Sequence, residues 1–218
     1  MVWLAVAWLG PLTPPQLQPG DWQKVAAEPH TYGIDRAHSL VGFEVRHFFN
    51  KVPGRFTRFD GKVIYDAEKP ENSSVHLVVE VDSVNTDLAT RDQHLRSEDF
   101  FFVEQHPQMS FRSTTVKKGE GNTLQVTGDF TMRGKTQRLT IPITVLGVME
   151  LGPGVAKAGF ETEFVINRKD FDVSWNRSLD QGGAMLGDEV TIRVILQLDR
   201  VPDTAGEGGG EAVGETDV

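Results

Sequence analysis

Most of the chain alternates apolar and polar residues with a period of two. This period is typical of a β-strand with one buried and one wet face. In residues 40–47, for example, Val41, Phe43 and Val45 share one face, whereas Glu44 lies on the other. The pattern predicts eight strands, at residues 39–48, 55–65, 74–83, 108–115, 123–132, 137–148, 156–167 and 189–200. Amphipathic strands in such a series predict an antiparallel sheet.

One segment between the third and fourth predicted strands has helical spacing instead. Residues 86–95 place Leu88 and Leu95 on one helical face, behind the cap candidates Thr86 and Asp87. We therefore expect a single short helix there.

Two positions disturb the strand pattern. Phe56 is out of phase with Phe59, which predicts a β-bulge within residues 55–65. Pro142 lies in the middle of a predicted strand, where it cannot donate a ladder hydrogen bond, so we expect an edge or a bulge at that position.

Eight amphipathic strands can close into a sandwich or a barrel. An eight-stranded barrel is wide enough either to fill with side chains or to hold one small ligand. Small inward residues alternate here with aromatic ones, which is compatible with ordinary packing and also with a tunnel walled by Phe rings. The small inward residues are Gly42, Gly61, Gly128, Ala158 and Thr162. An apolar tunnel would suit an alkyl or isoprenoid chain.

Composition narrows the classes of partner. The net charge is −9 and the chain has no basic stripe, which argues against nucleic acid as a partner. The same balance disfavours an anionic membrane surface, so a transient membrane contact is the most that we expect. The chain has no cysteine, which excludes disulfides, thiolate catalysis and cysteine-ligated metals.

The ends of the chain differ from its middle. Residues 1–29 form an apolar and Pro-rich segment, residues 30–201 carry the barrel pattern, and residues 202–218 form an acidic Gly-rich tail that we expect to be disordered. The uncharged stretch Met1–Leu12 resembles the apolar region of a secretory signal, although no basic residue precedes it. It predicts a periplasmic or secreted protein; the alternative is an uncleaved N-terminal arm.

Several motifs along the chain resemble the YceI-like family. They are Tyr32-Gly33-Ile34-Asp35, Val41-Gly42-Phe43, Arg91-Asp92-Gln93-His94-Leu95-Arg96-Ser97 and Leu186-Gly187-Asp188-Glu189-Val190. The resemblance extends over about residues 32–200. It implies an all-β fold, namely an eight-stranded antiparallel lipocalin-like barrel that binds a polyisoprenoid or similar amphiphilic lipid in the bacterial periplasm. It also implies a homodimer.

The candidate ligand-binding residues fall into an apolar and a polar group. The apolar group, expected to line the tunnel, is Phe43, Val45, Phe59, Phe111, Phe130, Phe160 and Phe164. The polar group, His47, Arg91 and His94, is expected at the mouth, where it would contact a lipid head group. Alternatively, Arg91 and His94 form a hydrogen-bonded knot with Asp92 that fixes the helix, because buried polar groups must be paired.

We predict a carrier or storage protein for an apolar lipid of polyisoprenoid or isoprenoid-quinone type, without enzymatic activity and without a cofactor. No pair of histidines has zinc-like spacing, and no nucleophile elbow is present, so neither a metal site nor a catalytic site is predicted. Two alternatives stay open: an isomerase or cyclase acting on such a lipid, and a filled barrel that serves as a stress or interaction module.

Overall fold

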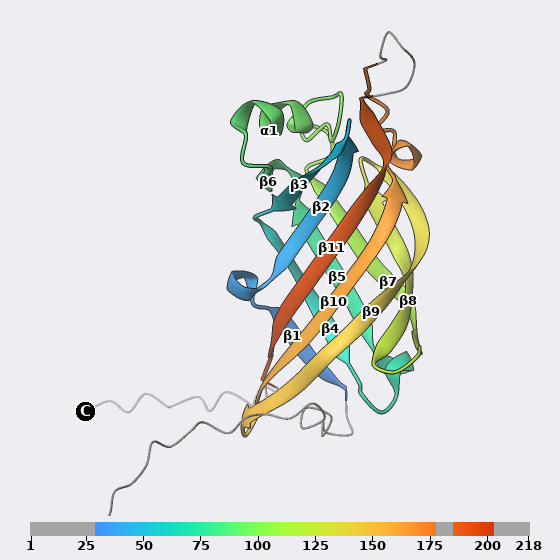
Figure 1. Ribbon diagram of the computed structural model, residues 1–218. Coiled ribbons are helices and arrows are strands. Elements are labelled where there is room, and N and C mark those ends of the chain that lie inside the picture. Colours follow the sequence, from blue (N-terminus) through green and yellow to red (C-terminus); the bar gives the residue numbers. More distant parts are fainter. Residues whose placement is uncertain (1–28, 178–184, 203–218) are drawn as a thin grey trace, which may run out of the picture.

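The computed structural model describes residues 29–177 and 185–202 (Figure 1). Residues 1–28 and 203–218, with the proposed signal segment and nearly all of the acidic tail, lie outside the described residues. One α-helix, α1 (Ala89–Arg96), and eleven strands form the described part. The strands are β1 (His30–Ile34), β2 (Leu40–His47), β3 (Asn50–Phe56), β4 (Phe59–Tyr65), β5 (Ser74–Glu80), β6 (Val84–Asn85), β7 (Gln108–Lys118), β8 (Thr123–Met132), β9 (Lys135–Gly152), β10 (Val155–Asn167) and β11 (Leu186–Arg200).

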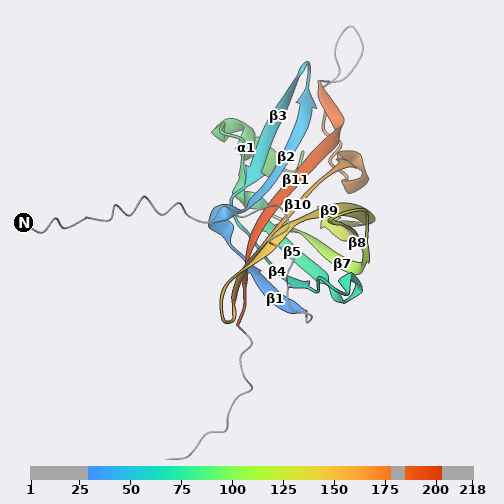
Figure 2. The same ribbon diagram turned by 60° about the horizontal axis from the view of Figure 1, so that its bottom comes forward.

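The sheet closes into a barrel because β1 pairs with both β4 and β11. Eight strands form the closed circuit, in the order β1-β4-β5-β7-β8-β9-β10-β11, and all neighbours are antiparallel. The strands β2, β3 and β6 continue the sheet from the upper part of β11 (Figure 2). The predicted eight-stranded antiparallel barrel with one short helix is therefore confirmed.

The observed strands differ from the predicted ones in two respects. β1 was not predicted; it supplies the closing pairs, such as Tyr32 with Arg200, whereas the predicted strand 39–48 became β2, outside the closed circuit. The predicted strand 55–65 is two strands, with a corner at Thr57 where a bulge was expected. Phe56 belongs to β3, which pairs with β2, whereas Phe59 belongs to β4, which pairs with β5. The phase change thus marks a switch of partner strand.

The predicted helix begins three residues later than expected. Leu88 is the N-cap residue, and its side chain makes no capping hydrogen bond. Thr86 instead donates from its backbone N–H and its hydroxyl to Asp92 Oδ1, at 2.8 and 2.5 Å. This pair ties the segment before the helix to the first turn, so Thr86 orders the helix without being its cap.

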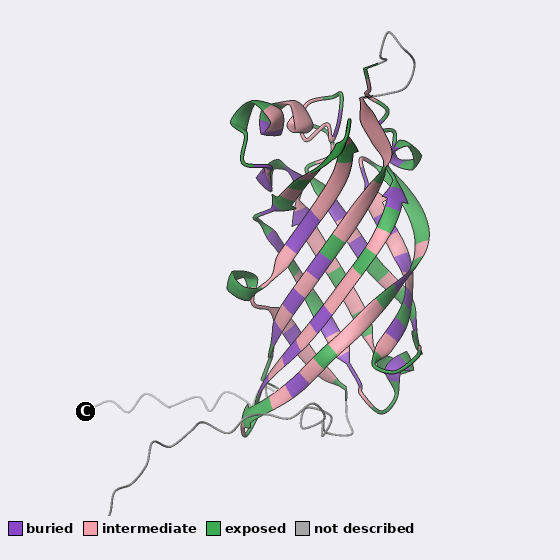
Figure 3. Cartoon of the chain, viewed as in Figure 1, coloured by how far each residue is buried: buried purple, intermediate pink, exposed green. Residues whose placement is uncertain are grey.

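Figure 3 shows buried and exposed positions alternating along the strands of the wall. The buried core includes Tyr32 and Leu198, which are completely covered at the end where β1 closes the barrel. Within residues 29–177 and 185–202, no helix is long and apolar enough to cross a bilayer.

Candidate functional site

The barrel encloses a cavity of about 80 Å³ near the middle of its strands, here called the lower cavity. Its walls come from both halves of the circuit and are almost entirely hydrocarbon. The lining residues are Val41, Val75, Leu77, Val79, Met109, Ser110, Phe111, Phe130, Ile141, Ile143, Phe160, Glu161, Thr162, Phe164, Ile192, Val194 and Leu196.

A second cavity of about 70 Å³ lies at the end of the barrel that carries α1. Here α1 and the segment after it contribute Leu95, Phe100 and Phe101, which cap this end of the interior. The remaining lining residues are Phe43, Val45, Phe56, Met109, Met132, Ile166, Arg168, Val173, Leu186, Val190 and Ile192.

The two cavities meet at Met109 and Ile192, because both residues line both spaces. Taken together, the two neighbouring cavities form an elongated apolar space. A space of this shape fits one thin chain better than a compact or ring-shaped molecule.

Glycines allow some of the Phe rings to pack closely. A Cβ on Gly54 would lie 2.2 Å from Cζ of Phe43, and a Cβ on Gly128 would lie 2.6 Å from Cζ of Phe111. The small-beside-large alternation of the sequence is thus partly ordinary packing, and the hollow is what this packing leaves unfilled.

One lateral seam in the wall lacks a backbone ladder. The pairing of β9 with β10 ends at Thr144 and Glu161, although both strands continue toward the upper end. Beyond that point the Thr162 hydroxyl donates to the carbonyl oxygen of Pro142 at 2.6 Å. Pro142 has no N–H to donate to a ladder with β10. This agrees with the expectation that Pro142 lies at a strand edge. The lower cavity reaches this seam, because Thr162 is part of its lining.

The predicted apolar residues lie in three places. Phe111, Phe130, Phe160 and Phe164 line the lower cavity, and Phe43 and Val45 line the upper one. Phe59 is buried, but it is not among the described lining residues of either cavity.

The predicted polar residues lie on the rim and are engaged with the protein itself. Arg91 donates to the hydroxyl and carbonyl oxygens of Thr86, at 2.7 and 2.6 Å. The His94 ring stacks edge-on against Trp175 and pairs with Asp99 at 2.9 Å. His47 lies at the end of β2 against Phe48. None of the three is among the described lining residues.

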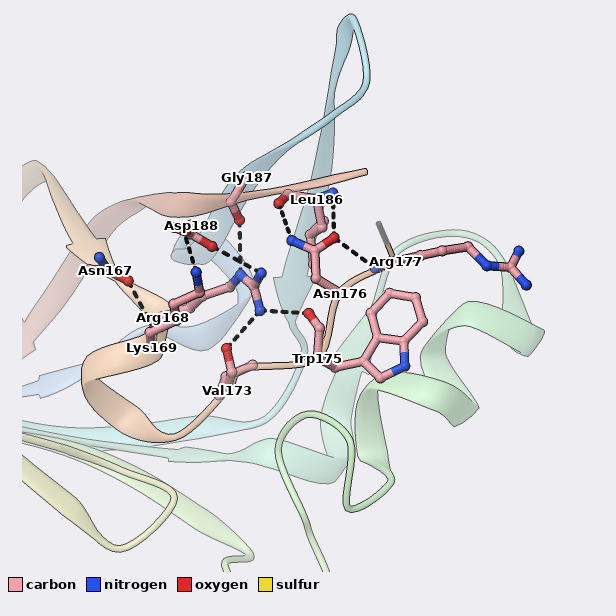
Figure 4. Close-up of polar contacts among 10 residues, drawn as sticks. All are labelled: Asn167, Arg168, Lys169, Val173, Trp175, Asn176, Arg177, Leu186, Gly187 and Asp188. Atoms are coloured by element: carbon pink, nitrogen blue, oxygen red, sulfur yellow. Dashed lines mark hydrogen bonds and ion pairs between the residues drawn. The ribbon is translucent and has the colours of Figure 1, made fainter. Parts of the chain in front are cut away.

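Sequence reasoning missed the charged residue that lines the upper cavity, Arg168 (Figure 4). Its side chain is 3% exposed and bonds to the carbonyl oxygens of Val173, Trp175 and Gly187, at 2.7, 2.8 and 2.9 Å. It also pairs with Asp188 at 3.1 Å. Burial lowers the pKa of the Arg168 guanidinium, and the Asp188 carboxylate acts in the opposite direction.

Arg168 thereby fixes the connection between β10 and β11 over the upper cavity. Four of its five N–H donors are directed at protein acceptors, so it closes that end of the hollow and presents little of its charge to a ligand. In the sequence it belongs to the charged run Arg168-Lys169-Asp170, which gives no sign that its first member is buried.

The described residues contain no group of three or more His, Cys, Asp or Glu side chains that could hold a metal ion. Ser39, a candidate nucleophile by residue type, donates to the carbonyl oxygen of Gln197 and accepts from its N–H, at 3.2 and 3.0 Å. Asp35 and His38 pair with each other at 2.8 Å. These three side chains stabilise the junction of β1 and β2 with β11.

Solved structures show the same fold. Burkholderia cenocepacia BcnA is 26% identical, with a TM-score of 0.66 over 75% of this chain and 98% of that one. A Campylobacter jejuni YCEI protein is also 26% identical, with a TM-score of 0.62 over 76% and 95% of the two chains. A polyisoprenoid binding domain from Saccharophagus degradans has a TM-score of 0.59 over 78% and 98% of the two chains, but it is 15% identical, which shows the fold alone.

Sequence comparison identifies the family. Protein YceI of Salmonella arizonae is 39% identical over 153 residues, which are 69% of this chain and 78% of that protein. Protein YceI of Salmonella newport matches to the same extent. The model of the YceI-like domain matches residues 32–198, which include all but the ends of the closed barrel. The chain therefore belongs to the YceI-like family.

Proposed function

We propose that the barrel binds one long apolar chain, of polyisoprenoid or isoprenoid-quinone type, and acts as a carrier or store for it. The observation that carries this proposal is the elongated hollow, in which two apolar cavities lie end to end and meet at Met109 and Ile192. The solved Saccharophagus degradans neighbour, described as a polyisoprenoid binding domain, supports the choice of ligand class.

Burial of hydrocarbon is sufficient to drive such binding. Each methylene removed from water contributes about 0.8 kcal/mol, so a chain of ten or more carbons needs no hydrogen bond for tight binding. The empty space is small, so a long chain must displace side chains, and the flexible Met109 and Met132 are suited to that adjustment. A polar head group would remain outside, because Arg168 is already paired with protein acceptors.

We propose no chemistry at this site. Of the polar residues that line the hollow, Ser110 and Thr162 are weak acids and Arg168 is held by four protein oxygens. Glu161 is a carboxylate, but the described lining of its cavity offers no second titratable side chain to work with it. An isomerase or cyclase would require a proton donor and acceptor at the reacting carbons, and the described lining offers no such pair.

Extraction of the purified protein into organic solvent, followed by mass spectrometry, tests the proposal. We expect a co-purifying polyprenyl or quinone lipid, or saturable uptake of a fluorescent polyprenyl probe by lipid-free protein. The absence of both would contradict the proposal and favour the filled-barrel alternative. Phe130→Asp, which places a charge in the lower cavity, should abolish uptake, and circular dichroism would show whether the variant is folded.

An extracytoplasmic location belongs to the same proposal and rests on the apolar stretch Met1–Leu12. Cell fractionation together with N-terminal sequencing of the mature protein would test it. The homodimer implied by the family resemblance is also a proposal, and sedimentation of the purified protein would test it. A carrier of such a lipid must collect it from a bilayer, so we also propose a transient contact with the membrane.

A further inference from the structure

The hairpin that joins β2 to β3 ends in two exposed aromatic residues. Phe49 is 93% exposed and Phe48 is 43% exposed, so Phe49 is the most exposed large apolar side chain of the described residues. Both lie where the hairpin projects beyond the rim of the barrel (Figure 2). The two adjacent rings form an exposed apolar patch, and patches of this kind mark sites of interaction with a protein or a membrane.

The hairpin tip is ordered and not frayed. Phe48 adopts a φ of 51°, a left-handed conformation that is rare for a bulky residue. Its N–H donates to the carbonyl oxygen of Met185 at 3.0 Å, and the His47 ring packs edge-on against its ring, with centroids 4.7 Å apart. The pairing of β2 with β3 continues up to His47 and Asn50. These contacts hold Phe48 in place, and the hairpin pairing fixes the backbone on which Phe49 stands.

Two cations flank the aromatic pair. Arg46 and Lys51 are cross-strand partners directly below the tip, and Lys51 pairs with Glu44 at 2.6 Å. The chain as a whole is strongly acidic, with a net charge of −9. The segment 44–51 has the opposite balance, with two cations and one carboxylate. Aromatic rings between basic side chains are the residues that anchor proteins at a membrane interface.

The tip is continuous with the proposed lipid site. Phe43 and Val45 lie on β2 below the tip, and they line the upper cavity. Leu186 and Val190 on the neighbouring strand β11 line it as well. A bilayer that received the two rings would therefore lie next to the end of the barrel that holds the upper cavity.

We propose that the tip segment Arg46–Lys51 is the surface by which this protein docks on a phospholipid bilayer. Phe48 and Phe49 enter the headgroup layer, and Arg46 and Lys51 lie at the level of the phosphates. The tip is too small for a stable protein partner, since a standard interface covers about 800 Å² on each side. The purpose of this docking surface, which is to collect the lipid from the bilayer, rests on the proposed function.

The test is co-sedimentation of the full chain with phosphatidylethanolamine vesicles, with and without added phosphatidylglycerol. We expect the wild type to bind, more strongly with phosphatidylglycerol and less at high salt. Phe49→Asp should lower the vesicle partition coefficient roughly tenfold or more, because a Phe side chain that enters the headgroup layer is replaced by a charge. Arg46→Glu should lower it chiefly on vesicles that contain phosphatidylglycerol.

The matched control is Leu151→Asp. Leu151 is 55% exposed and lies near the tip of the β9–β10 hairpin, at the opposite end of the barrel (Figure 1). This variant should partition like the wild type. Uptake of a detergent-dispersed polyprenyl probe, which needs no bilayer, should be unchanged in both Asp variants.

The inference would be overturned if the wild type did not bind vesicles, or if Phe49→Asp and Leu151→Asp lost vesicle binding equally. A change from dimer to monomer in Phe49→Asp would also overturn it, because the tip would then contact a second copy of the chain. A wild type that binds vesicles through the tip but takes up no probe would refute the proposed cargo and leave the docking surface standing.

Discussion

Met109 on β7 and Ile192 on β11 line both internal cavities, and they do so from opposite sides of the eight-stranded circuit. Together they lie between the lower and the upper cavity. Met109 is buried, unbranched and flexible, so its side chain can move aside without a change of the backbone. This pair should therefore decide how far a chain can extend along the barrel axis.

Met109→Trp should divide the hollow at this point. We expect short apolar chains to bind about as well as in the wild type, whereas long polyprenyl chains lose roughly tenfold or more in affinity, because part of each chain stays in water. Titration with a series of alkyl or prenyl probes of increasing length would measure the effect. Met109→Ala is the opposite change and should not discriminate by length, and a uniform loss across the series in Met109→Trp would refute a constriction.

Arg168→Met should destabilise the connection between β10 and β11. The change removes the donor from three carbonyl oxygens, of which that of Val173 is buried and those of Trp175 and Gly187 are partly buried, and it removes one of the two cations at Asp188. A buried acceptor left without a donor typically costs about 1–3 kcal/mol. Equilibrium unfolding in urea would measure the loss. Lys169→Met is the control: Lys169 contacts the same carboxylate at 2.7 Å, but its side chain is 49% exposed. Surface pairs contribute about 1 kcal/mol or less, so an equal loss in the two variants would contradict this assignment.

Asp35 should make stability depend on acid pH. Its hydrogen bond with His38, supported by Gln197 and Lys157, lowers the pKa of the carboxyl group from 3.8 to about 2. A carboxyl group with a lowered pKa in the folded state stabilises above its unfolded pKa, and that contribution is lost as the pH falls through the folded pKa. Thermal unfolding from pH 5 to pH 2 should show the wild type losing its advantage over Asp35→Asn below about pH 4. Curves that stay parallel would refute a role for Asp35.

Gly54→Ala should force Phe43 out of its place. The added Cβ would overlap the ring at 2.2 Å, and Phe43 lines the upper cavity, so a shift of the ring changes the shape of that cavity. We expect a destabilisation of about 1–3 kcal/mol, as is common for overpacked cores, together with weaker lipid uptake. Gly33→Ala is the control, because its Cβ would meet only Val201, at 3.9 Å.

A double variant checks the mechanism of that effect. Adding Phe43→Leu to Gly54→Ala removes the ring that clashes, so the two changes should be less harmful together than the sum of the single variants. Strictly additive losses would mean that Gly54 is required for another reason.

The barrel was predictable because period-two alternation leaves a strong signal in long strands. That signal weakens in short ones: β1 has five residues, and only Tyr32 among them is fully buried. The break after Phe56 was visible as a change of phase, but a bulge and a corner shift the phase alike. Only the pairing of Phe59 with Val79 on β5, a long-range contact, separates them.

The site shows the same division. Inward Phe residues such as Phe130 and Phe160 could be found from alternation, because a lining and a core use the same pattern. Alternation could not reveal whether a hollow remains, since that depends on how rings meet glycines across strands. Nor could it reveal Arg168, whose acceptors are carbonyl oxygens of residues that the sequence marks in no way.

The seam between β9 and β10 gives the wall a direction of least resistance. Where two strands of the circuit are paired, parting them means breaking a row of backbone hydrogen bonds, whereas above Thr144 and Glu161 the strands β9 and β10 are linked by the bond from Thr162 to Pro142. The barrel wall should therefore open first along this unpaired stretch. A ligand too wide for the closed barrel would be accommodated there by an outward shift of β9, while the other strand pairs stay intact.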